Sequence, residues 1–321
     1  MKRRTLFKTA FGALLAPAAA PLFAFPAAGT PGPVPALPPD SEVLLRFGYL
    51  ADPHYSDRPD RTNPERGVIR AYRDSLERIR EAAALFSARS AAFAIELGDF
   101  KDMDATKTRD GTLRCLSAAE SAFAEFPGPR YHVIGNHDCD LISLSDFLAN
   151  TENTGAACGR NYYAFESNGV KCLVLDACYN ELAGDHYAPE HYNWKIAWIP
   201  DAELEWLGNE LASGTGPVLV FLHQLLNYWD AGIAFKNRFV VRNARAVVEL
   251  LEKSGRVQAV FSGHYHKGFF TKRNGIRYIV AKAMVTKPLP YTAGAVVTLD
   301  RHLSLFVEGF GKERSHTCRK A

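Results

Sequence analysis

The sequence of 321 residues contains no acidic side chain before Asp40, although four of its 38 basic residues precede that position. From residue 40 onward, the remaining 34 basic side chains nearly balance the 35 acidic ones, which leaves a net charge of −1. A nearly neutral body provides no electrostatic basis for binding nucleic acid or an anionic membrane surface. We therefore expect neither of these as a partner.

Several diagnostic motifs are also absent. None of the six cysteines forms a C-x-x-C pair, which argues against a zinc ribbon or a thioredoxin-type site. Disulfides and buried free thiols both remain open, because the spacing of the cysteines does not select a pairing. No H-E-x-x-H sequence is present, which argues against a zinc peptidase. The content of 47% apolar and 23% charged residues excludes disorder for the bulk of the chain.

The N-terminal segment has the pattern of an export signal. Its basic start precedes an apolar run of 17 residues from Thr9 to Phe25. This run is shorter than the roughly 20 residues that cross a bilayer, and Pro17 and Pro21 interrupt it, so we expect no stable membrane span. We interpret residues 1–28 as a signal peptide, with an uncleaved anchor as the alternative.

The residues Arg3-Arg4-Thr5-Leu6-Phe7-Lys8 resemble a bacterial twin-arginine signal. This resemblance implies export of a folded protein by the twin-arginine machinery to the periplasm or another extracytoplasmic space. The Pro-rich residues 29–40 are expected to form an extended linker. The folded domain is expected to cover residues 41–312, followed by a C-terminal tail at 313–321.

Apolar segments of strand length alternate with longer segments of helical period in the first four fifths of this domain. The predicted strands there are 44–50, 92–97, 130–134, 162–166, 170–176, 217–222 and 257–261. The predicted helices are 65–89, 112–126, 200–211 and 241–253. Only strands are predicted afterwards, at 268–272, 276–281, 294–299 and 303–307. This order predicts an α/β (α+β) fold in which two mixed β-sheets face each other and helices flank them.

Five polar clusters directly follow five of the predicted strands. They are Asp52-Pro53-His54, Gly98-Asp99-Phe100-Lys101-Asp102, Gly135-Asn136-His137-Asp138, His223, and Gly263-His264-Tyr265-His266. In α/β folds ligands bind beyond the carboxyl ends of the strands, so we expect these clusters to converge.

The side chains in these clusters are typical metal ligands. The candidates are Asp52, His54, Asp99, Asn136, His223, His264 and His266. Carboxylates, imidazoles and an amide oxygen suit divalent transition ions such as Mn, Zn or Fe. Seven ligands are too many for one tetrahedral ion but fit two ions that share a carboxylate. The sequence therefore predicts a dinuclear centre.

The ordered motifs D-x-H, G-D-x-x-D, G-N-H-D, H and G-H-x-H resemble those of calcineurin-like metallophosphoesterases, over about residues 45–310. The resemblance implies the sandwich fold of that family and two ion sites that share Asp99. One ion would be held by Asp52, His54, Asp99 and His266, and the other by Asp99, Asn136, His223 and His264. It further implies that His137 contacts substrate, that Asp138 orients His137, and that Asp102 supports the ligands.

A regional likeness narrows this interpretation. Residues 52–55 and 70–76 resemble the branch that contains manganese-dependent ADP-ribose/CDP-alcohol diphosphatases, although residues such as Arg70 could instead lie on a solvated helix. Residues 185–198 could form a lid or a packed surface loop, and residues 228–239 could form a rim that offers Lys236 and Arg238 to an anionic substrate.

The function that we expect is that of an exported, dinuclear metal-dependent phosphohydrolase. It would cleave phosphoester or pyrophosphate bonds by metal-activated hydroxide attack, as a phosphatase, phosphodiesterase or nucleotide diphosphatase. The expected substrate is a small phosphorylated molecule, such as a nucleotide derivative. The alternatives are a nuclease of the same superfamily, which would need a basic groove, and a non-catalytic scaffold, which would have lost ligands.

Overall fold

The structure is a computed structural model that describes residues 36–320 except 64–67, 158, 181–183, 231 and 233–237. The predicted signal peptide and the first part of the predicted linker lie outside the described residues, as do Cys158 and Lys236. Among the helices of the described part, none combines the length and the apolar character needed to cross a membrane. The five cysteines in the described ranges are free thiols.

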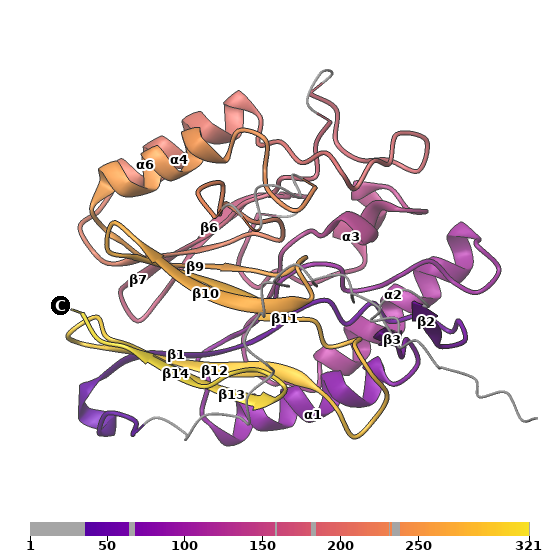
Figure 1. Ribbon diagram of the computed structural model, residues 1–321, viewed down its shortest axis with the longest axis horizontal. Coiled ribbons are helices and arrows are strands. Elements are labelled where there is room, and N and C mark those ends of the chain that lie inside the picture. Colours follow the sequence, from indigo (N-terminus) through magenta and orange to yellow (C-terminus); the bar gives the residue numbers. More distant parts are fainter. Residues whose placement is uncertain are drawn as a thin grey trace, which may run out of the picture. The chain divides into compact units, whose positions relative to one another are not determined.

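Two six-stranded sheets face each other in the domain (Figure 1). The first sheet has the order β14-β13-β12-β1-β4-β5. Its strands are β1 (Val43–Leu50), β4 (Ala94–Glu96), β5 (Arg130–His132), β12 (Ala293–Asp300), β13 (Leu305–Gly311) and β14 (His316–Cys318). Strands β1, β4 and β5 are parallel, whereas β12, β13 and β14 are joined by antiparallel pairing. The C-terminal residues predicted to be a tail therefore include an edge strand, because residues 316–318 pair with β13.

The second sheet has the order β10-β11-β9-β8-β7-β6. Its strands are β6 (Tyr163–Ser167), β7 (Val170–Val174), β8 (Val218–Phe221), β9 (Val257–Ser262), β10 (Lys267–Arg273) and β11 (Ile276–Lys282). The four central strands are parallel, and the edge strands β6 and β10 are antiparallel to their neighbours. Both edge hairpins turn at an Asn-Gly pair in the left-handed region, at residues 168–169 and 274–275, which is the conformation that this dipeptide favours.

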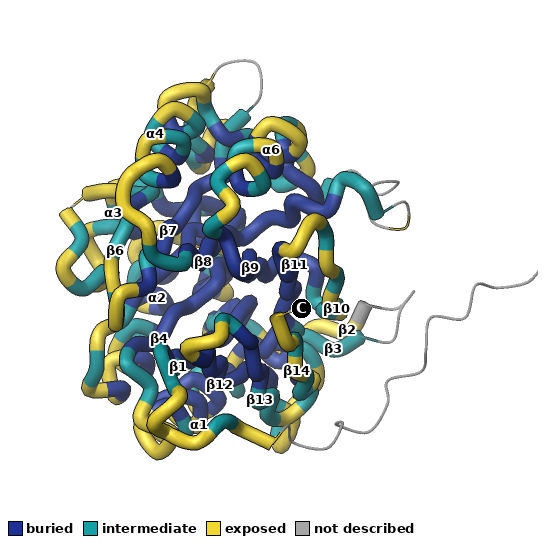
Figure 2. The backbone as a smooth tube through the Cα atoms, turned by 90° about the vertical axis from the view of Figure 1, so that its left-hand side faces the viewer, coloured by how far each residue is buried: buried dark blue, intermediate teal, exposed yellow. Residues whose placement is uncertain are grey.

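Helices cover the outer faces of both sheets, and the central strands between them are buried (Figure 2). Helices α1 (Ser75–Ala88), α2 (Arg109–Phe123) and α3 (Leu144–Ala149) pack beside the first sheet, and α4 (Asp201–Ala212) and α6 (Ala244–Ser254) pack on the second. The predicted α/β fold with two facing mixed sheets is therefore confirmed.

Strand β1 shows why its sequence suits a strand with both faces buried. Its alternate side chains Leu45, Phe47 and Tyr49 belong to the core between the sheets. On the opposite face, a Cβ at Gly48 would lie 2.3 Å from the ring of Phe86, so only glycine lets helix α1 approach this closely.

The helix predicted over residues 65–89 is wrong in its first part. Residues 68–70 form strand β3 (Val68–Arg70), which pairs with β2 (Arg61–Asn63), and α1 begins only at Ser75. The apolar side chains at 68 and 69 matched a helical period, but the backbone of Ile69 is paired elsewhere, since its carbonyl accepts from Lys287 N at 2.8 Å. Pairing between distant segments thus overrides the local pattern.

Candidate metal centre

The candidate ligands lie where parallel strands of both sheets end. Asp52, Asp99 and Asn136 follow β1, β4 and β5 of the first sheet. His223 follows β8 of the second sheet, and His264 and His266 follow β9. Because the carboxyl ends of parallel strands share one edge, the facing sheets bring these side chains together at one end of the sandwich.

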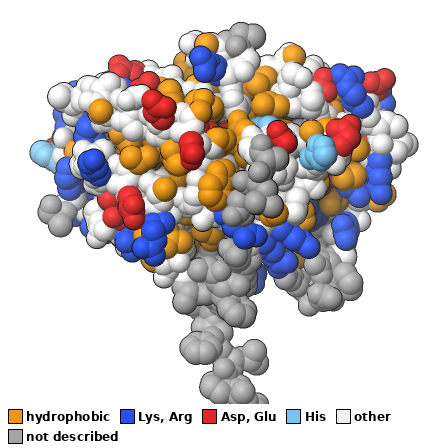
Figure 3. Space-filling view, turned by 90° about the horizontal axis from the view of Figure 1, so that it is seen from above, with side chains coloured by type: hydrophobic (Ala, Val, Ile, Leu, Met, Phe, Trp, Pro, Cys, Tyr) orange, Lys and Arg blue, Asp and Glu red, His pale blue; other side chains and the backbone are white. Residues whose placement is uncertain are grey.

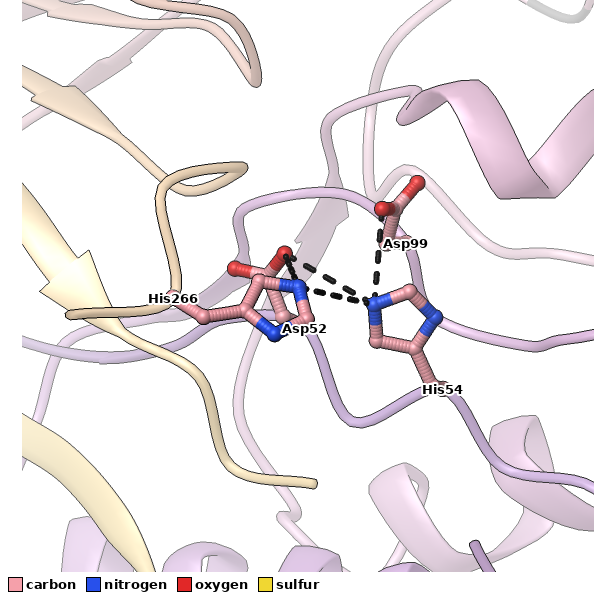
Figure 4. Close-up of side chains that lie close together, drawn as sticks. All are labelled: Asp52, His54, Asp99 and His266. Carbon is pink, nitrogen blue, oxygen red and sulfur yellow. Dashed lines mark hydrogen bonds and ion pairs between the residues drawn. The ribbon is translucent and has the colours of Figure 1, made fainter. Parts of the chain in front are cut away.

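One group consists of Asp52, His54, Asp99 and His266, whose ligand atoms all lie within 4.8 Å of one another. Figure 4 shows the two imidazoles and the two carboxylates turned toward a common point. His266 Nε2 lies 3.2 Å from Asp52 Oδ1 and 3.2 Å from His54 Nε2. His54 Nε2 also lies 3.5 Å from Asp99 Oδ2. This is the set that the resemblance implies for one ion.

A second group contains Asp99, His223 and His264. The oxygen of Asp99 that faces His54 also lies 3.2 Å from His223 Nε2, so one carboxylate belongs to both groups. His223 Nδ1 lies 2.8 Å from the carbonyl oxygen of Leu97. Because this oxygen can only accept a hydrogen bond, Nδ1 carries a proton, and Nε2 of His223 is the nitrogen that can bind metal at the centre. Asn136 lines the same cavity as Asp99 and His264.

The donor atoms fit divalent cations. Asn136 Oδ1 is buried and has no hydrogen-bond partner among the residues that the structure describes. A buried acceptor without a partner is costly, and a cation removes that cost. Burial, together with His223, lowers the pKa of His264 to about 3, which leaves a neutral imidazole that can bind metal.

The two aspartates also have the charge state that a cation site needs. Burial alone would raise the pKa of Asp99, but His223, His137 and His54 hold it well below the ordinary range for aspartate. Burial likewise opposes ionisation of Asp52, whose pKa His266 nevertheless lowers. Carboxylate, neutral imidazole and amide donors together suit transition ions such as Mn, Zn or Fe(II).

The backbone at the centre is strained. Asp52, His54, Asp99 and His264 all have positive φ, of 52°, 47°, 57° and 63°. Residues with side chains rarely adopt this region, and it persists where the surrounding structure enforces it, often at functional sites. Close packing also explains the glycine of G-N-H-D, because a Cβ at Gly135 would lie 2.0 Å from Asp99 N.

His137 points into the cavity, but the carboxylate beside its ring is not the predicted one. Asp138 accepts hydrogen bonds from the backbone N–H groups of Asp99, Phe100 and Gly135, at 2.9, 2.9 and 2.8 Å. The expected role of Asp138 in orienting His137 is therefore wrong, because its oxygens hold the neighbouring loop. Asp140 Oδ2 instead lies 3.2 Å from His137 Nδ1.

Asp102 lies behind the first group, as the resemblance implies. Its Oδ2 is 3.6 Å from His54 Nδ1, and its Oδ1 accepts from Arg58 Nη1 at 3.2 Å. Arg58 was not among the predicted site residues, and only its place four residues after the first motif could have suggested it. Arg70, for which a solvated helix face was one of two interpretations, lies on β3 and lines the cavity.

A cavity of about 780 Å³ opens over the centre. Its basic lining residues are Arg61, Arg70, Arg238 and Lys267. The segment predicted as a lid or surface loop, residues 185–198, contributes Trp194 to the cavity wall. The segment predicted as a rim, residues 228–239, contributes Arg238 and Phe239. The guanidinium of Arg238 lies 5.5 Å from the Trp194 ring centre and 5.2 Å from that of Phe239. The cavity thus combines cations and aromatic rings.

Comparison with known families places this geometry in a class of enzymes. The family model described as calcineurin-like phosphoesterase matches residues 45–268. The chain belongs to the calcineurin-like phosphoesterase family. As a calcineurin-like phosphoesterase it is a phosphoric ester hydrolase, and its donor groups serve two divalent metal ions.

Among curated members of this family, the chain is similar to manganese-dependent ADP-ribose/CDP-alcohol diphosphatases. It is 25% identical to that of Arabidopsis thaliana, over 82% of this chain and 94% of the relative. It is 24% identical to that of Danio rerio, over 77% of this chain and 89% of the relative.

Solved structures share the fold of this calcineurin-like phosphoesterase. A dimetal phosphatase from Danio rerio superimposes with a TM-score of 0.75 at 20% identity, covering 87% of this chain and 100% of that structure. A purple acid phosphatase from yellow lupin superimposes with a TM-score of 0.55 at 13% identity, covering 86% of this chain and 53% of that one.

Proposed function

We propose that the chain is an exported phosphohydrolase that uses two divalent ions to cleave the pyrophosphate bond of small nucleoside-diphosphate derivatives. The observation that carries the proposal is the shared position of Asp99, whose Oδ2 lies 3.5 Å from His54 Nε2 and 3.2 Å from His223 Nε2. A single carboxylate oxygen between two ligand groups is what a pair of ions requires.

In this proposal each sheet supplies part of the ligand set. The first ion would be held by Asp52, His54, Asp99 and His266, and the second by Asp99, Asn136, His223 and His264. When bound, such a pair of ions lowers the pKa of nearby water and neutralises phosphoryl charge. Asp102 orients His54 from behind, and the carbonyl of Leu97 fixes the tautomer of His223.

His137 is the residue that we assign to proton transfer. Its ring lies on the cavity wall with 21% of the side chain exposed, whereas the adjacent Asn136 is buried. From that position His137 can donate a proton to the oxygen that leaves phosphorus, which makes it a general acid.

The substrate class is supported by the cavity and by the relatives. A nucleoside-diphosphate derivative carries two negative charges and a planar base, which match the basic and aromatic lining residues. The curated relatives are named for ADP-ribose and CDP-alcohols and for manganese, so these compounds and this ion are the first to test.

The test is a substrate panel with manganese-loaded protein that lacks residues 1–28. We expect faster turnover of ADP-ribose and CDP-alcohols than of p-nitrophenyl phosphate, bis-p-nitrophenyl phosphate or an oligonucleotide, and loss of all turnover after chelation. Preference for the oligonucleotide would favour a nuclease, and absence of turnover with every metal would favour a scaffold. The variant Asp110→Ala, at an aspartate with an 81% exposed side chain, serves as the control.

Export is tested separately. We expect the double variant Arg3→Lys, Arg4→Lys to leave the precursor in the cytoplasm, because the paired arginines would be what the twin-arginine machinery reads. Fractionation with an antibody against the folded domain measures the distribution. Unchanged export of the double variant would point to another route.

A further inference from the structure

Two carboxylates lie near Nδ1 of His137, and they are engaged differently. Asp140 Oδ2 is 3.2 Å from His137 Nδ1, whereas Asp102 Oδ1 is 3.7 Å away. Asp102 Oδ1 already accepts from Arg58 Nη1 at 3.2 Å and from Met103 N at 2.8 Å. The geometry therefore favours Asp140 as the partner of the imidazole.

Local structure explains how Asp140 reaches the ring. Residues 136–139 form a short 3-10 helix, and Asp140 is its C-terminal cap. In a 3-10 helix the side chains at positions i and i+3 eclipse each other, which brings Asp140 beside His137. Asp138, one residue after His137, points instead at the loop of residues 99–101.

Lys101 holds this arrangement in place. Its ammonium group forms an ion pair with Asp140 Oδ1 and donates to the backbone carbonyl of His137 at 2.5 Å. The side chains of Lys101 and Asp140 are both fully buried. A buried charge pair with additional hydrogen bonds is rigid, because breaking it would leave an uncompensated charge. One lysine thus fixes both the main chain of His137 and the carboxylate beside its ring.

We propose that Asp140, held by Lys101, is the positioning residue that keeps Nε2 of His137 turned toward the cavity, while Asp102 serves His54. This inference rests on the proposed role of His137 in proton transfer. A carboxylate that accepts from Nδ1–H selects the tautomer and restricts rotation of the ring. Loss of Asp140 should therefore reduce the rate without removing the ions.

The test is a double-mutant cycle. Lys101→Met with Asp140→Asn removes both buried charges together, and this pair is measured in the native background and with His137→Ala. We expect kcat to fall about 10- to 100-fold in the native background, as for other partners that orient an imidazole, with KM within about twofold and metal content unchanged. With His137→Ala present, the same pair of substitutions should cause no further fall.

Asp102→Asn is the matched comparison, since it alters the other carboxylate near the same ring. We expect it to weaken metal binding, because Asp102 supports His54. An equal loss of kcat from the Lys101/Asp140 pair in both backgrounds would show that these residues act on folding rather than through His137, and would overturn the inference.

The ¹⁵N spectrum of the imidazoles in metal-free protein provides a readout that does not depend on activity. We expect the Nδ1–H signal of His137 to change with Asp140→Asn and to persist with Asp102→Asn; the reverse result would overturn the inference. If His137→Ala leaves kcat unchanged, the proposed role of His137 as proton donor is wrong. The spectrum then still shows whether Asp140 positions the ring of His137. If the double variant does not fold, Asp140→Glu replaces it, because this substitution keeps the charge but moves the carboxylate. A kcat of Asp140→Glu equal to that of the native protein would count against the inference.

Discussion

At the scale of single residues, Asn136 and His137 are neighbours with different environments. Asn136 is 2% exposed, with Oδ1 buried and without a partner among the described residues, whereas the His137 side chain is 21% exposed on the cavity wall. The backbone N–H of His137 donates to Asp99 Oδ1 at 2.7 Å, so the main chain of His137 supports the shared carboxylate independently of its ring. The ring is therefore available for chemistry.

We predict that His137→Ala keeps both ions and the fold but lowers kcat by roughly 10² to 10⁴, the usual contribution of a positioned general acid. The fall should be larger for substrates with a poor leaving group, such as alkyl phosphates, than for nitrophenyl esters. Steady-state kinetics with both substrate types, together with elemental analysis, measure these effects.

The variant His302→Ala, at an exposed position, is the control for this measurement. Equal losses for both leaving groups would assign His137 to stabilising phosphoryl oxygens rather than to protonation. Loss of metal from His137→Ala would mean that this residue is a ligand after all.

The sequence predicted the candidate metal ligands more fully than the residues that hold those ligands and His137 in place. The candidate ligands stand directly after strands, so strand order alone indicates that they meet at one edge. Asp138 and Asp140 could not be distinguished in this way, because which of them faces His137 depends on a 3-10 turn that no local pattern specified. Lys101 was visible within its cluster, but its buried pairing with Asp140 arises only in the tertiary structure.

At the scale of elements, an ion pair ties helix α2 to the first sheet. His132 of β5 lies 2.9 Å from Glu120 of α2 and 3.7 Å from Glu96 of β4. Burial alone would lower the pKa of His132, but Glu120 and Glu96 raise it to about 9. Burial raises the pKa of Glu96 to about 8. The helix and the two strands are thus linked by groups whose pKa values in the folded protein are about 8 and about 9.

Because the pKa of His132 in the folded protein lies above the ordinary histidine value of 6.5, the contribution of His132 to stability is complete below pH 6.5 and is lost as the pH rises through about 9. We predict that His132→Gln lowers the free energy of unfolding by roughly 2–3 kcal/mol near pH 6 and by much less above pH 9.5. Urea unfolding across this range measures the difference.

His302→Gln, at an exposed histidine, should leave the pH profile of unfolding unchanged. Since Glu96 also titrates in this window, the relevant quantity is the difference between His132→Gln and the native protein. A difference that does not vary with pH would show that His132 contributes by packing and not by charge.

Prediction of elements from local pattern succeeded where the pattern and the long-range pairing agree. From β4 onward the predicted strands and helices were found with shifts of a few residues at their ends, as for α2, predicted from 112 and observed from Arg109 after its cap Thr108, whereas α3 and β14 were not predicted. The β2–β3 hairpin was missed because Val68 and Ile69 fit a helical spacing, whereas their strand pairs with Arg61–Asn63. Such a pairing is not encoded in a window of neighbouring residues.

At the scale of the whole domain, the ligand set joins the two sheets. Asp52, Asp99 and Asn136 come from the first sheet, and His223, His264 and His266 come from the second. On the face shown in Figure 3, acidic and basic side chains are interspersed among apolar ones, as a body of nearly zero net charge predicts. Ions bound at the centre would therefore join the two sheets at this end of the sandwich.

We predict that chelation destabilises the domain, because ions that bind only the folded state add to its stability. With free manganese at about 100 times its dissociation constant, the gain is about 2.7 kcal/mol per site. Thermal unfolding with and without chelator measures this effect. Equal melting temperatures under both conditions would show that the folded domain does not bind the ions.

The most direct test of the central claim is the metal content of Asp99→Ala. If this carboxylate is shared, elemental analysis should find close to two transition ions per native chain and almost none in the variant. Circular dichroism should show that the variant keeps its fold. Asp110→Ala, at an exposed aspartate, should keep both ions. Retention of one tightly bound ion by Asp99→Ala would contradict the shared role of Asp99 and with it the dinuclear centre described here.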